Sequence, residues 1–307
     1  PGPRFTKQYY NTFLKMAHSE NPLFAIWKMI HPWNFFDFGD IVQNLPQYQS
    51  LLQTLKRHKE EIENFLVTKL SFFIPSNRKI TEHVALTVEW AIRGWTSRNY
   101  AGLNIEYFKD NYEDLYSTII HEVFHRIQLK VLPKPKERKP SDLAIDFDVL
   151  FDFPELRIQE QKKYEMLAYI FLEGSATTIS NITKKVKDIN KYDNAKKGLS
   201  LCREIFDKLD KFEQEKERND SLIKDVEKLI NQGLRNNGPF YALGNYMFDI
   251  IQGQIGKESG KIILEKGIHK FYSLYFEVSQ NSTKLLKFPE KIQNQIQNNR
   301  KFIQDYL

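Results

Sequence analysis

The chain has 307 residues, of which 41% are hydrophobic and 14% aromatic, and this composition excludes a disordered chain. Its 45 Lys and Arg residues are interspersed with 39 Asp and Glu residues, so the net charge of +6 does not require a nucleic-acid partner and we expect none. The single cysteine, Cys202, excludes an intramolecular disulfide, and no apolar run is long enough to span a membrane.

The first 79 residues are predicted to form a helical region. Apolar side chains recur at helical spacing over residues 3–21, residues 22–39 are rich in aromatics that we expect in a core, and residues 45–70 have the pattern of one amphipathic helix. Residues 80–307 then form the second unit, unless the whole chain is a single domain. The chain opens at Pro1, as a cloning scar or a trimmed precursor does, and we expect a secreted or periplasmic location rather than a cytoplasmic one. The oligomeric state stays open.

Between residues 80 and 107 the hydrophobic period changes from helical to alternating. This alternation predicts two strands, one containing Val84, Leu86 and Val88 and the other Leu103, Ile105 and Tyr107. Residues 94–102 are predicted to form the turn region between them.

Residues 115–131 are predicted to form a buried helix that carries the pattern H-E-x-x-H. Residues four apart lie on one helix face, so His121 and His125 can hold one metal ion between them. Glu122 projects about 100° round the helix from His121, where a base for a metal-bound water belongs. The alternative is a helix with two core histidines that only make hydrogen bonds.

Residues 132–161 separate this helix from the next. The segment begins with a proline-rich, charged stretch that predicts an exposed loop, and continues with acidic residues alternating with Phe. We expect it to form a wall or lid of a cleft, or else a plain surface excursion.

A second helix is predicted over residues 164–180, and Glu173 lies on its apolar face. A carboxylate there is costly unless a positive group meets it, and zinc would. Small residues at 174–176 would let this helix approach another closely. His121, His125 and Glu173 would make three ligands with one open position, which is typical of a catalytic zinc site. Competing acids are Glu165 and the acidic residues 146–152. The alternative is that Glu173 lies at a partly exposed helix end and binds no metal.

The C-terminal part is predicted to be helical throughout. Two amphipathic stripes within residues 181–232 predict a helical hairpin, and Gly238 and Pro239 predict the start of a helix that runs to residue 256. Two further helices are predicted over residues 261–278 and 289–307.

Three blocks of sequence resemble a known family. H-E-x-x-H followed by L-E-G-x-A at Leu172–Ala176 resembles the gluzincin metallopeptidases, and the second block looks like the N-E-G-x-A segment of the zinc aminopeptidases. Two features depart from those enzymes: 47 residues separate His125 from Glu173, and the G-x-M-E-N pattern is absent. Arg126 also fills a position that is usually uncharged. The nearest resemblance is to zinc-dependent peptidases that add a later G-P-[FY]-Y-x-x-G, found here at residues 238–244, and it covers residues 82–275.

The resemblance implies an α+β, predominantly α, zincin (gluzincin-like) fold, with a small mixed sheet against the H-E-x-x-H helix and a helical C-terminal half. It implies zinc as cofactor, Glu173 as third zinc ligand, and hydrolysis of a peptide or protein substrate with Glu122 as general base. It also implies an edge strand that binds extended peptide, and a later Tyr that donates to the oxyanion. Tyr241 is the candidate, with Tyr246 behind it, unless Tyr241 merely packs. The alternatives are a zinc hydrolase of another bond and an inactive interaction protein with the same fold.

Overall fold

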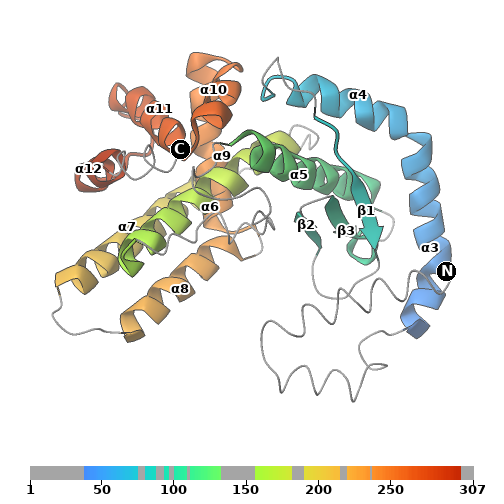
Figure 1. The fold of residues 1–307 in the computed structure, drawn as a ribbon, viewed down its shortest axis with the longest axis horizontal. Coiled ribbons are helices and arrows are strands. Elements are labelled where there is room, and N and C mark those ends of the chain that lie inside the picture. Colours follow the sequence, from blue (N-terminus) through green and yellow to red (C-terminus); the bar gives the residue numbers. More distant parts are fainter. Residues whose placement is uncertain are drawn as a thin grey trace.

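The computed structural model describes residues 38–74, 80–87, 93–96, 100–108, 111–132, 156–181, 190–214, 220–235 and 237–298. The helix predicted over residues 3–21, most of the aromatic segment 22–39, most of the linker 132–161 and the end of the last predicted helix lie outside these ranges. In chain order the elements are α3 (Phe38–Arg57), α4 (Lys59–Leu70), β1 (Val84–Thr87), β2 (Gly94–Thr96), β3 (Ala101–Asn104), the 3-10 helix η2 (Ile105–Tyr107), α5 (Tyr112–Val131), α6 (Ile158–Asn181), α7 (Lys191–Gln214), α8 (Asp220–Leu234), α9 (Pro239–Ile255), α10 (Ser259–Lys266), α11 (Ile268–Gln280) and α12 (Glu290–Asn298). Figure 1 shows α6 to α12 on one side of a small sheet and α3 on the other.

The described part of the chain is mostly helical with one mixed sheet, which confirms the prediction of a predominantly α, α+β protein. The sheet has the order β1-β3-β2, with β1 parallel and β2 antiparallel to the central strand β3. None of the described helices is both long and apolar enough to cross a membrane.

The prediction of two strands was wrong in two respects. A third strand, β2, lies in the region that was predicted to be a turn, and it has only three residues, too few to show alternation. The predicted second strand stops at Asn104, whose side chain accepts a hydrogen bond from the backbone N–H of Glu106 and so starts η2 instead. All four residues of β3 are buried, so both faces of this strand are covered.

Two helices that were predicted as continuous are each divided. The helix over residues 45–70 breaks at His58, which lies in a charged run without apolar positions and separates α3 from α4. The helix over residues 261–278 breaks at Gly267, whose φ of 76° is readily adopted only by glycine, and α11 starts there in a new direction. Both divisions are set by single residues within an otherwise helical pattern.

Helix α5 lies at the centre of the molecule, with the sheet on one side and α6 on the other (Figure 1). Asn111 caps its first turn by accepting from the backbone N–H of Asp114. Apolar side chains are buried on several sides of the helix, including Leu115, Ile119, Ile120, Val123, Phe124 and Ile127. The predicted buried helix is therefore present, and its position between sheet and helices leaves polar side chains on it without water.

Helices α6 and α9 cross at two glycines, with backbone against backbone. A Cβ on Gly244 would lie 1.9 Å from the carbonyl oxygen of Ile170, and one on Gly174 would lie 2.3 Å from Gly244 Cα. The small residues of α6 thus allow another helix to approach it closely, as predicted. At Gly174 that helix is α9. This crossing places the first turn of α9 beside the part of α6 that carries Glu173.

Candidate metal centre

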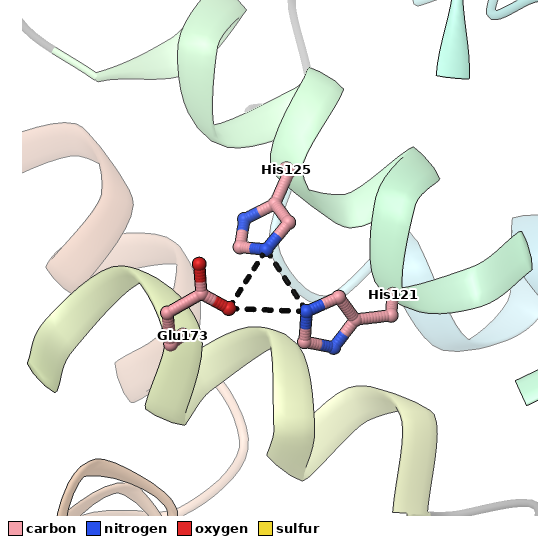
Figure 2. A group of neighbouring side chains, drawn as sticks. All are labelled: His121, His125 and Glu173. Carbon is pink, nitrogen blue, oxygen red and sulfur yellow. Dashed lines mark hydrogen bonds and ion pairs between the residues drawn. The ribbon is translucent and has the colours of Figure 1, made fainter. Parts of the chain in front are cut away.

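Three side chains from α5 and α6 converge on one point (Figure 2). His121 and His125 present their Nε2 atoms 3.0 Å apart, and Glu173 Oε2 lies 3.2 Å from each of them. Among the described residues this is the group of His, Cys, Asp and Glu side chains whose spacing could hold a metal ion. The structure therefore brings together the three residues that were predicted as ligands.

The spacing of the three donor atoms fits a tetrahedral metal ion. Zinc bonds of about 2.0–2.1 Å to nitrogen and oxygen separate the donors of a tetrahedral site by about 3.3–3.4 Å. The observed 3.0 to 3.2 Å needs an adjustment of only a few tenths of an ångström. Two imidazoles and one carboxylate are also a donor set that zinc accepts, so the residues present fit the ion.

The charges of the cluster support one another without an ion. Burial would raise the pKa of Glu173, but His125 and His121 outweigh it and hold the pKa well below its usual range. Burial would likewise lower the pKa of His125, yet the Glu173 carboxylate raises it to about 9. A cation that displaces the imidazole proton would take over this favourable interaction with the carboxylate.

Glu122 lies beside the triangle and is held by the sheet. Its side chain is buried, and Thr96 of β2 donates a hydrogen bond to its Oε2 at 3.0 Å. Gly94 of the same strand leaves room for it, because a Cβ there would lie 2.7 Å from Glu122 Oε1. Burial raises the pKa of Glu122, although His121 and His125 act in the opposite direction. The carboxylate is thus a better proton acceptor than one in water.

Tyr241 also reaches the cluster, from the first turn of α9. Its ring stacks on that of His121, with centroids 6.3 Å apart and planes inclined by 17°. Burial and a hydrogen bond to Glu173 both raise the pKa of its phenol, which keeps the hydroxyl protonated at neutral pH. Tyr246 does not join it, because its hydroxyl accepts from the backbone N–H of Leu286 in the core.

The competing acidic residues are placed elsewhere or lie beyond the described ranges. Glu165 pairs with Lys162 at 3.0 Å on the surface of α6, two turns before Glu173. The acidic residues 146–152 fall outside the part of the chain that the structure describes. Arg126, which is unusual at its position, is buried and pairs with Glu82 at 3.0 Å, just before β1.

Four residues at the site were missed from the sequence. Gly94 and Thr96 lie in the strand that was predicted as a turn, and nothing in the sequence links them to Glu122. Gln128 and Ser175 form a buried hydrogen-bonded pair behind His125. Gln128 is detectable in principle, since it follows His125 by three positions and therefore lies one turn along the same helix face.

Two histidines and a glutamate at metal-binding spacing, with a further buried glutamate beside them, define a candidate metal site. The family comparison agrees: residues 6–284 match the family described as "Putative zinc dependent peptidase (DUF5700)", and the chain belongs to that family. Comparison with curated proteins and with solved structures gave no significant match.

Proposed function

We propose that the protein is a zinc-dependent peptidase of the gluzincin type. The observation that carries this proposal is the convergence of His121 Nε2, His125 Nε2 and Glu173 Oε2 within 3.2 Å of one another, with Glu122 buried beside them. The family description supports zinc dependence and peptide cleavage at the level of the family.

The three donors would hold the ion and leave one position open. A zinc ion there would polarise the scissile carbonyl and lower the pKa of an attacking water. The protein side chains enclose it well, since the side chains of His121 and Glu173 are only 17% and 14% exposed and that of His125 only 3%.

Glu122 is the general base in this proposal. Its carboxylate accepts the proton of the attacking water and later delivers it to the leaving amine nitrogen, while Thr96 bonds Oε2. The raised pKa favours the first transfer, because the carboxylate binds a proton more readily than a solvated one. The hydrogen bond from Thr96 keeps the carboxylate in a single orientation between these transfers.

Tyr241 is the proposed donor to the oxyanion. Its hydroxyl, which bonds Glu173 in the structure, stays protonated and is held over the cluster by the packing of α9 on α6. A donor that is fixed before the reaction stabilises developing negative charge without reorganisation.

Strand β2 is the proposed docking edge for an extended peptide. The backbone N–H of Asn104 donates to the carbonyl of Arg93, so these two form a hydrogen-bonded pair of the antiparallel ladder. Because such pairs alternate, Gly94 and Thr96 direct their N–H and C=O groups away from β3. Both residues contact Glu122, and a peptide paired along this edge would run past the base.

Elemental analysis and digestion of a peptide library test the proposal. We expect about one zinc per chain and cleavage of peptide bonds by the wild-type protein, and loss of the metal in His121→Ala. Glu122→Gln should retain zinc and lose activity by about 10²- to 10⁴-fold, because the amide keeps the shape but cannot accept a proton.

Each contrary result points to one alternative. Absence of any transition metal in wild-type protein would refute the ligand assignment. Zinc binding without peptide cleavage would favour hydrolysis of another bond or an inactive interaction protein. Undiminished turnover in Glu122→Gln would remove Glu122 as the base.

A further inference from the structure

A chain of hydrogen bonds runs from the far side of the His125 ring into helix α6. His125 Nδ1 lies 2.7 Å from Gln128 Oε1, and Gln128 Nε2 lies 2.7 Å from Ser175 Oγ and 3.1 Å from the backbone oxygen of Leu172. Gln128 and Ser175 are both fully buried. No water is needed to complete the bonding of these groups, so their partners determine how each one is oriented.

The direction of every hydrogen bond in this series follows from carbonyl groups that can only accept a hydrogen. The Leu172 carbonyl accepts only, so the Gln128 atom facing it must be the amide nitrogen. Ser175 Oγ lies 2.7 Å from the carbonyl oxygen of Phe171 and donates its single hydrogen there, so it too accepts from Gln128. Both amide hydrogens of Gln128 are then in use, and Oε1 is left to face His125.

This orientation decides which nitrogen of His125 can bind a metal. Gln128 Oε1 can only accept, so the Nδ1 of His125 must carry a hydrogen. In the neutral ring the lone pair is then on Nε2, the atom that meets His121 and Glu173. In the opposite tautomer, Nδ1 of His125 and Oε1 of Gln128 would both be acceptors and would face each other, buried, with no hydrogen between them.

We propose that Gln128, anchored to α6 by Leu172 and Ser175, is the positioning residue that sets the tautomer and ring orientation of His125 for zinc binding. The inference rests on the proposed function, since it concerns the same metal site. It adds a link between the two ligand helices: Leu172 and Ser175 flank Glu173, so one buried amide aligns the second histidine with the segment that supplies the carboxylate. Partners of this kind fix metal-bound imidazoles in other proteins.

Zinc affinity of the full chain, measured by chelator competition, tests the inference. Gln128→Met keeps the volume but removes the acceptor, and affinity should fall by about 10- to 100-fold. Gln128→Glu also loses the donors to α6, but its charged carboxylate is a stronger acceptor for Nδ1 than the amide oxygen, so this variant should unfold more easily yet bind zinc almost as tightly as the wild type. This pair separates positioning of the ring from support of the fold.

Helix α6 offers a matched pair of buried hydroxyls. Ser175→Ala removes an anchor of Gln128 and should weaken zinc binding measurably. Thr178→Val is the control, because Thr178 is also buried and bonds back to the carbonyl of Gly174 at 3.1 Å but makes no contact with His125. Its zinc affinity should equal that of the wild type.

Nitrogen-15 spectra of the histidine side chains give a second readout. In zinc-loaded wild-type protein, His125 should show an Nδ1–H that exchanges slowly with solvent, and Gln128→Met should show faster exchange. If wild-type protein binds zinc and Gln128→Met binds it equally well, the inference fails while the proposed function stands. Equal losses in Gln128→Glu and Gln128→Met would assign Gln128 a structural role only and also overturn it. If wild-type protein binds no zinc, the proposed function fails and the inference with it.

Discussion

Replacing Gly244 by Ala would test how closely α6 and α9 must approach to build the site. The added Cβ would lie 1.9 Å from the carbonyl oxygen of Ile170 and 2.8 Å from Gly174 Cα. Ordinary contact at such an atom begins at 3.4 Å, and both neighbours are backbone that cannot rotate away. Helix α9 must therefore move outward by about 1.5 Å, which a close-packed interior resists.

The structure supports a large effect on stability. Overpacking of a core typically costs about 1–3 kcal/mol, and a clash between two helix backbones belongs at the upper end, about 3 kcal/mol. For a chain of 307 residues such a loss lowers Tm by about 5 °C. Tyr241 lies one turn before Gly244 on α9, so the same displacement should separate its hydroxyl from Glu173 and reduce peptide cleavage.

Gly253 of the same helix is the matched control. It is exposed, and a Cβ on it would meet nothing within 4 Å. Gly253→Ala should therefore stabilise the protein by about 0.5–1 kcal/mol, because Ala is the better helix former. Thermal unfolding followed by circular dichroism, with urea titration in parallel, measures both variants. Shifts of the same sign and size in the two variants would refute the reasoning.

Three further predictions follow from the site and the core. In parallel zinc titrations, Glu173→Gln should lose zinc affinity strongly. Glu165→Gln should lose it only slightly, because Glu165 pairs with a lysine on the helix surface. A larger loss in Glu165→Gln would overturn the ligand assignment. Gly94→Ala places a Cβ 2.7 Å from Glu122 Oε1, so kcat should fall by about 10- to 100-fold with zinc content unchanged, and an unchanged kcat would contradict this. Asp210→Asn should destabilise the protein by about 3 kcal/mol at neutral pH, since it leaves the buried Lys163 of α6 without its charged partner. Burial would raise the pKa of Asp210, but its lysine partners hold it low, so the contribution is present above about pH 4 and declines at lower pH. A destabilisation that urea unfolding shows to be the same at pH 7 and pH 3 would argue against the ion pair.

The sequence by itself determined the features that depend on short-range helix geometry. His121 and His125 are four residues apart in an uninterrupted apolar helix, and the helical repeat alone puts their rings on one face. Glu173 was identifiable because a carboxylate on an apolar helix face needs a positive partner. Gly238 and Pro239 likewise marked the start of α9 before any contact was known.

The tertiary structure alone decided which residues surround these groups. Strand β2 is too short to show a hydrophobic period, so the sequence did not reveal that Thr96 would hold Glu122. The crossing of α6 and α9 directs Tyr241 toward His121 and leaves Tyr246 in the core, and the sequence alone did not show this difference. Such contacts depend on how whole elements pack, and packing distances are set by residues far apart in the chain, such as Gly174 and Gly244, rather than by the local repeat of the backbone.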